Sequence, residues 1–103
     1  MALNIQNPIN DIIDAALAVF PNLDCDIRFA GFPQDGPYGE TFWPDDGGRT
    51  IVQVAANITL EGVLEVIGHE LAHVAVGPNM GHGQEWEAAF DAIHKEFCRR
   101  MEQ

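Results

Sequence analysis

Three stretches of the chain place apolar residues three and four positions apart, which is the spacing that lines one face of an α-helix. We expect helices over residues 8–20, 60–76 and 84–100. Asn7 and Thr59 are suited to cap the first two helices, and Gly77-Pro78 should end the second. The apolar faces are, in chain order, Ile9, Ile12, Ile13, Ala16, Leu17 and Phe20; Leu60, Val63, Leu64, Ile67, Leu71 and Val74; and Trp86, Ala89, Phe90, Ile93, Phe97 and Met101.

The segment between the first two helices has the composition of short strands and turns. Strands are expected over Asp26 to Ala30, Tyr38 to Trp43 and Thr50 to Ala56, and the last of these is rich in β-branched residues. A turn signal, Pro44 to Gly48, separates the second strand from the third. These features predict an α+β fold with an N-terminal helix, a small, mostly antiparallel sheet, a central helix and a C-terminal helix. The length of 103 residues corresponds to a single domain over 1–103.

The charge balance narrows the range of partners. Sixteen acidic and five basic residues give a net charge of -11. This balance speaks against nucleic acid as a partner, because phosphate binding needs clustered Lys and Arg. Lys95, Arg99 and Arg100 are better suited to complement the C-terminal end of the last helix.

Cysteine content and hydropathy bear on location. Cys25 and Cys98 are too few for a disulfide framework, and neither belongs to a C-x-x-C motif. We see no secretory signal and no membrane-spanning segment, so the expected location is the cytoplasm, with both thiols reduced. Cys25 is interpreted as a structural thiol rather than a metal ligand.

The central helix carries the candidate chemistry, an H-E-x-x-H motif that reads His69-Glu70-Leu71-Ala72-His73. Two histidines four positions apart share one helix face and can bind one metal ion. Glu70 follows the first histidine and is placed to take a proton from an attacking water. His82, in a G-H-G sequence nine residues beyond His73, can turn back as a third ligand. Three protein ligands and one open position describe a catalytic zinc site, with one Zn²⁺ per chain.

Other residues could take some of these roles. Glu85 or Glu87 could replace His82 as third ligand, and both, with Asp91, are candidates to orient the histidines. Tyr38 is a candidate to stabilise the transition state, whereas His94 is expected to be an exposed residue outside the site.

With these residues in view, the chain resembles a minimal zincin metallopeptidase of the SprT-like family, which includes the Spartan-type and WLM-type proteases. The resemblance covers about residues 59 to 90. It rests on H-E-x-x-H, a variable turn, a third histidine and an aromatic residue four positions later, here Trp86. The Gly77-Pro78 pair also resembles the WLM group.

The resemblance implies a zinc endopeptidase with His69, His73 and His82 as ligands and Glu70 as general base. It also implies that a substrate strand pairs with the edge strand before the active helix, expected around Ile51 to Ala55. The chain lacks the zinc ribbon and basic DNA-binding segment of better-known relatives, which argues against a DNA-dependent role. It also departs from the metzincins, whose third histidine would fall at Asn79.

Other functions remain open at this point. A peptide deformylase would need a cysteine ligand, but the surroundings of Cys25 do not match that family. A three-histidine endoribonuclease would lack the equivalent of Glu70 and would need a basic surface. A non-catalytic, zinc-stabilised protein-binding module of zincin fold is the more serious alternative.

Overall fold

The computed structural model describes residues 7–33, 36–78 and 81–102. The elements follow the order α1 (Pro8–Val19), β1 (Asp26–Ala30), β2 (Gly39–Phe42), β3 (Ile51–Ala55), α2 (Leu60–Val76) and α3 (Gln84–Met101). The chain is therefore α+β, as predicted, and each expected helix and strand is present within one or two residues of its expected bounds. Residues 34 and 35, between β1 and β2, and residues 79 and 80, between α2 and α3, lie outside the described residues.

The sheet is mixed rather than mostly antiparallel. Its strand order is β1-β3-β2, with β1 parallel and β2 antiparallel to β3. The strand β3 is central because it is the most apolar of the three, and Val52, Val54 and Ala55 are fully buried there. Ala30 and Tyr38 flank its end from opposite sides, since Ala55 donates a hydrogen bond to Tyr38 and Ala56 donates one to Ala30. The chain therefore crosses from one sheet edge to the other between β1 and β2.

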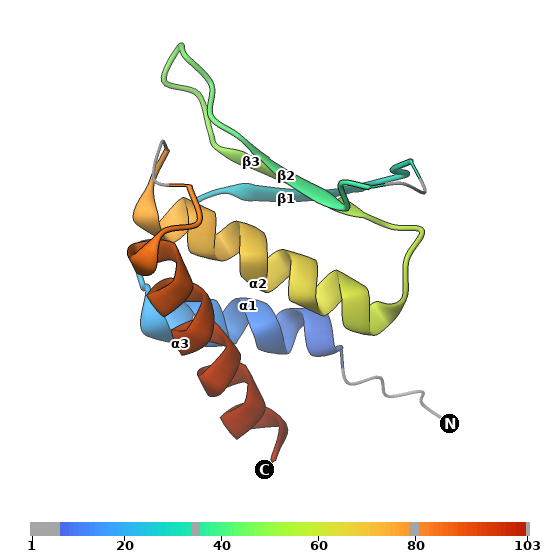
Figure 1. Cartoon of the computed structure of the whole chain (residues 1–103), viewed down its shortest axis with the longest axis vertical. Helices are drawn as coiled ribbons and strands as arrows, with labels where there is room; N and C mark the ends of the chain where they lie inside the picture. The colour runs from blue at the N-terminus through green and yellow to red at the C-terminus, as the bar shows by residue number, and fades with distance from the viewer. Residues whose placement is uncertain (1–6, 34–35, 79–80, 103) are drawn as a thin grey trace, which may run out of the picture.

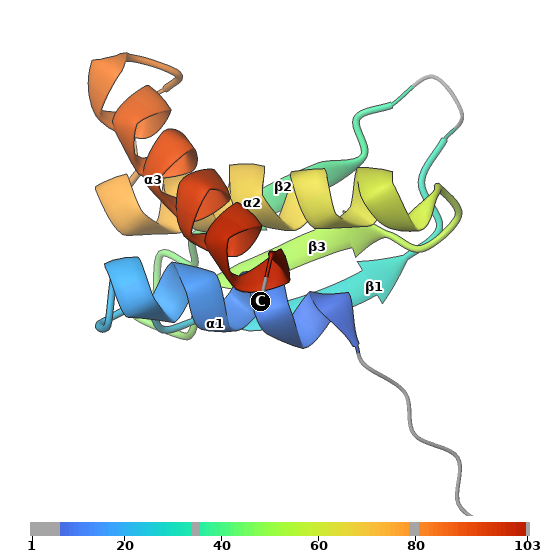
Figure 2. The ribbon, with the colours of Figure 1, turned by 90° about the horizontal axis from the view of Figure 1, so that it is seen from below.

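The helices lie on one side of the sheet (Figures 1 and 2). Helix α2 packs against β2 and β3, and α1 and α3 pack against α2 and against each other. The largest fully buried side chains are Ile67, Ile93, Val52 and Val54. Each contributes about 1.5–3 kcal/mol by leaving water. Helix α2 is thus held between the sheet and the other two helices.

The predicted helix ends are confirmed by capping contacts. Asn7 Oδ1 accepts a hydrogen bond from the Ile9 amide at 3.0 Å, and Thr59 Oγ1 accepts one from the Gly62 amide at 3.1 Å. Gly77 ends α2 with φ of 94°, a conformation that side chains disfavour. Within the described residues, no helix is long and apolar enough to cross a membrane.

The apolar faces are correct in their centres and wrong at their margins. Leu60 is 54% exposed and Met101 is 47% exposed, because each lies in a terminal helical turn beyond the neighbouring helices. Leu17, at the margin of the α1 stripe, is also exposed. On α2 an unexpected residue is buried: Glu70, which faces the sheet.

Candidate metal centre

Three histidines from two parts of the chain converge at one point. His69 and His73 lie one turn apart on α2, and His82 lies two residues before α3 begins. The Nε2 atoms are 3.3 Å apart between His69 and His73, 2.9 Å between His73 and His82, and 3.2 Å between His82 and His69. The three residues form a group that could hold a metal ion.

The donor set fits a divalent cation such as zinc. Ligand nitrogens at about 2.0–2.1 Å from a tetrahedral zinc lie about 3.3 Å from one another, close to the spacings found here. Three ring nitrogens directed at one point cannot all be satisfied by each other, because a neutral imidazole offers one donor and one acceptor. Burial lowers the pKa of both His69 and His73, and nearby imidazoles add to the effect, although Glu70 partly opposes it at His69. Both rings are therefore biased towards the neutral form that binds metals.

Trp86 forms the wall behind the histidines. Its indole Nε1 donates a hydrogen bond to the His69 carbonyl at 3.2 Å. The centroid of its ring lies 4.6–5.6 Å from those of the three imidazoles. The Phe90 ring stacks on the indole of Trp86, with ring centroids 5.3 Å apart and an angle of 7° between the ring planes. The first turns of α3 therefore pack against the histidine rings, and one hydrogen bond joins them to the main chain of α2.

Glu70 is held in place by β2. Its side chain is buried, and Oε1 accepts a hydrogen bond from Thr41 Oγ1 at 2.8 Å. The other oxygen, Oε2, lies 3.7 Å from His69 Nε2 and so faces the histidine cluster. Gly39 permits the close approach of β2, since a β-carbon there would collide with Val66 and would lie 3.3 Å from Glu70 Cγ. One carboxylate oxygen is thus engaged by the sheet, and the other is directed towards the metal centre.

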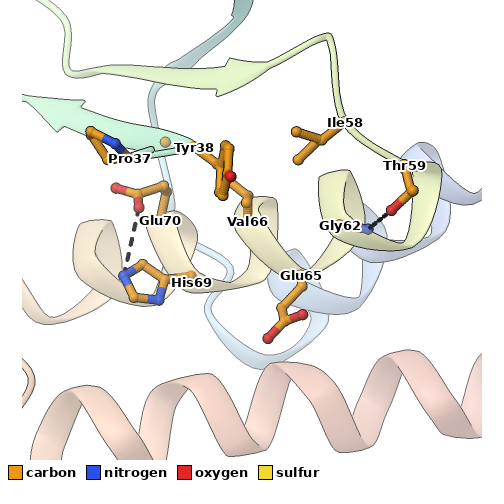
Figure 3. A pocket seen from close by; sticks show the side chains of 10 residues that line it. Pro37, Tyr38, Ile58, Thr59, Gly62, Glu65, Val66, His69 and Glu70 are labelled. Carbon is orange, nitrogen blue, oxygen red and sulfur yellow. Dashed lines mark hydrogen bonds and ion pairs between the residues drawn. The ribbon is translucent and has the colours of Figure 1, made fainter. Parts of the chain in front are cut away.

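A cavity of about 720 Å³ opens beside Glu70 and His69 (Figure 3). The segment before β2 and the first turns of α2 form its walls. Its lining residues are Pro37, Tyr38, Gly39, Ile58, Thr59, Gly62, Glu65, Val66, His69 and Glu70. A smaller cavity of about 220 Å³ lies on the other side of Glu70, where Thr41, Trp43 and His73 are among its lining residues. Glu70 therefore borders both cavities.

The other candidates of the sequence analysis lie apart from the cluster. Glu85 and Glu87 are exposed on the first turn of α3 and are not members of the three-histidine group. Asp91 pairs with Lys95 instead of orienting a histidine.

His94 and Cys25, which were not expected to bind the metal, lie outside the three-histidine group, whereas the candidate Tyr38 lies beside Glu70. His94 Nε2 is 3.6 Å from Cys98 Sγ on the outer part of α3. Cys25 is partly buried next to Arg49 and outside the metal group, and burial raises the pKa of its thiol. Tyr38 lines the large cavity next to Glu70.

The expected substrate-pairing strand is wrong. Ile51–Ala55 is the central strand, and both of its sides are already paired, by β1 and by β2. The edge strand that adjoins the site is β2, whose Thr41 contacts Glu70. Sequence order placed the edge immediately before the active helix, but the most apolar strand takes the centre of the sheet instead.

Thr41 is the site residue that the sequence analysis missed. It belongs to a four-residue strand and to no recognisable motif. The available signal was its alternation with Phe42 and Glu40, both of which are exposed and so mark the other face.

Comparison of the chain with protein-family models, with curated proteins and with solved structures gives no match.

Proposed function

We propose that this protein is a zinc-dependent endopeptidase of the SprT-like zincin type. The observation that carries the proposal is the convergence of three histidine Nε2 atoms beside a buried carboxylate that has one oxygen directed towards them. A metal site that served structure alone would not require Glu70 at this position. The H-E-x-x-H order and the aromatic residue after His82 add support from the sequence.

The residues of this chain have separate roles in the proposed reaction. His69, His73 and His82 would hold the zinc, which would supply Lewis-acid chemistry when bound. Glu70 accepts the proton of that water through Oε2 and delivers it to the leaving amine. Thr41 keeps Oε1 engaged, so the carboxylate presents a fixed oxygen to the reaction.

The free side of β2 offers a way to align the substrate. An extended peptide can add to an exposed sheet edge through main-chain hydrogen bonds. Such a peptide would pass Glu70 and the two cavities that flank it. Since main-chain pairing is independent of sequence, this arrangement suits cleavage of unfolded protein segments.

The test is cleavage of an unfolded, fluorescently labelled protein by the zinc-loaded chain. We expect wild type to cut it, chelation to stop cleavage, and Glu70→Gln to abolish cleavage while retaining zinc. Glu87→Gln, the same change on an exposed residue of α3, is the matched control and should remain active. An inactive wild type with full zinc, or an active Glu70→Gln variant, would contradict the proposal.

One observation favours a second function, a non-catalytic binding module. The histidine cluster joins α2 to the start of α3, so a metal ion there would tie two helices of a small domain together. In that case zinc should raise the melting temperature of wild type and of Glu70→Gln alike, and neither should cleave any peptide.

A further inference from the structure

The large cavity beside Glu70 has an apolar wall and an acidic edge. Ile58 and Val66 supply aliphatic surface, and Tyr38 supplies an aromatic ring that is 42% exposed. Figure 3 shows Tyr38 and Val66 between the sheet and α2, whereas Glu65 points from α2 away from the sheet. A side chain that entered here would meet an apolar surface first and a carboxylate at the margin.

No hydrogen bond or ion pair to Glu65 is found within the described part of the chain. Its carboxylate acts electrostatically on His69, one turn further along α2, where it opposes the lowering of the pKa by burial. Four of the five basic residues are engaged elsewhere: Arg49 pairs with Asp24 and Asp26, and Lys95 pairs with Asp91. Those at the end of α3 pair with Glu96, and none of the five basic residues lines the cavity.

We propose that this cavity binds a lysine or arginine side chain of the substrate next to the cleaved bond, with its aliphatic stem on Val66 and Ile58 and its charge at Glu65. The inference rests on the proposed peptidase function and names the substrate class of that site. Basic side chains combine a long apolar stem with a charged end, so they match both parts of the cavity. A guanidinium can in addition lie against the exposed Tyr38 ring.

The acidic charge of the rest of the chain also favours basic substrates. Glu70 lines the same space as Glu65, and the chain as a whole carries a net charge of -11. A field of one sign raises the local concentration of oppositely charged substrate and repels acidic segments. Acidic residues next to the cleaved bond should therefore be excluded, and neutral apolar ones should bind more weakly than basic ones.

The experiment compares fluorogenic peptides that differ in one residue. Each has an otherwise Gly-, Ser- and Ala-based sequence containing a single arginine, or citrulline or glutamate in its place. Citrulline keeps the shape of arginine and removes its charge. Wild type, Glu65→Gln and Glu61→Gln are compared; Glu61 lies one turn earlier on α2 and outside the cavity, so its change controls for net charge.

We expect wild type and Glu61→Gln to cleave the arginine peptide about two- to five-fold faster in kcat/KM than the citrulline peptide, the size typical of an exposed ion pair. The ratio should fall towards one in Glu65→Gln, and for wild type at high salt. Mass spectrometry should place the cut next to the basic residue. An unchanged ratio in Glu65→Gln, or equal cleavage of arginine and citrulline peptides by wild type, would overturn the inference.

A binding measurement separates this inference from the peptidase proposal. Fluorescence anisotropy of the labelled peptides is recorded on zinc-loaded Glu70→Gln, with and without Glu65→Gln. Preferential arginine binding that depends on Glu65, without cleavage by wild type, would support the basic-side-chain site and contradict the peptidase. Cleavage without any charge preference would support the peptidase and contradict the basic-side-chain site. Absence of both preferential binding and cleavage would overturn both proposals.

Discussion

Replacing Thr41 by valine tests the reasoning about Glu70 most directly. Valine keeps the shape and the β-branching of threonine and removes the hydroxyl that donates to Glu70 Oε1 at 2.8 Å. Glu70 is only 6% exposed, so the change removes a hydrogen-bond donor from a largely buried carboxylate. A hydrogen bond to a charged group is worth about 1.5–3 kcal/mol, and losing it should lower the free energy of unfolding by about that amount.

The effect on activity follows from the same contact. Without the hydroxyl, Glu70 is no longer held with Oε2 directed towards the histidines. If the loss of this positioning raises the activation free energy by about 1.4–2.8 kcal/mol, kcat falls about 10- to 100-fold. The value of KM should change little, because Thr41 acts on the proton-accepting group rather than on substrate binding.

The assay measures kcat and KM of zinc-loaded wild type, Thr41→Val and Thr41→Ser on one fluorogenic peptide, with urea unfolding of each protein. Serine restores the hydroxyl, so it should recover most of kcat. The reasoning is refuted if Thr41→Val keeps wild-type kcat, or if Thr41→Ser is as impaired as Thr41→Val. Zinc content measured on the same samples excludes loss of the metal as the cause.

Three further predictions address the metal centre and its frame. Wild type should bind about one zinc per chain by elemental analysis. The His82→Ala variant should lose the zinc or bind it much more weakly, whereas His94→Ala should keep it. Full zinc in His82→Ala would remove His82 from the ligand set. Burial lowers the pKa of His69 and of His73 below 6.5. Below that pH the unfolded chain therefore binds more protons than the folded chain, so the melting temperature of the metal-free protein should fall as the pH drops below 6.5. A melting temperature that rises there would contradict the assigned direction. Gly39→Ala should cost about 1–3 kcal/mol in urea unfolding, since its methyl group collides with a valine of α2, and an unchanged midpoint would show that β2 can move away.

The helices and the histidines could be predicted because their signals are local. Helical spacing, a capping residue such as Thr59 and a stop such as Gly77 each act within a few positions, and His69 and His73 are neighbours on one helix face. His82 was also predictable, since it lies nine residues past His73, which is far enough for the chain to turn back towards the helix.

The sheet and the residues around Glu70 could not be predicted in the same way. Strand order depends on contacts between distant segments, and chain order favoured neighbouring strands as partners although β1 and β3 are the parallel pair. The contact of Thr41 with Glu70 spans 29 positions and depends on the register of β2 on β3. The apolar character of Ile51–Ala55 is typical of a central strand, and it is a better guide than proximity to α2, which led to the wrong prediction of an edge strand there.

The positions of the two tryptophans give the site an optical readout of its own. Trp86 lies against all three imidazoles, and Trp43 lines the small cavity that also contains His73 and Glu70. These are the only tryptophans in the chain, so its tryptophan emission comes from one residue packed on the three histidines and one that borders the small cavity beside Glu70. Single Trp→Phe variants would separate the two signals, Trp86 reporting on the histidines and Trp43 on the small cavity, so metal loading and peptide entry could be followed in solution without a label.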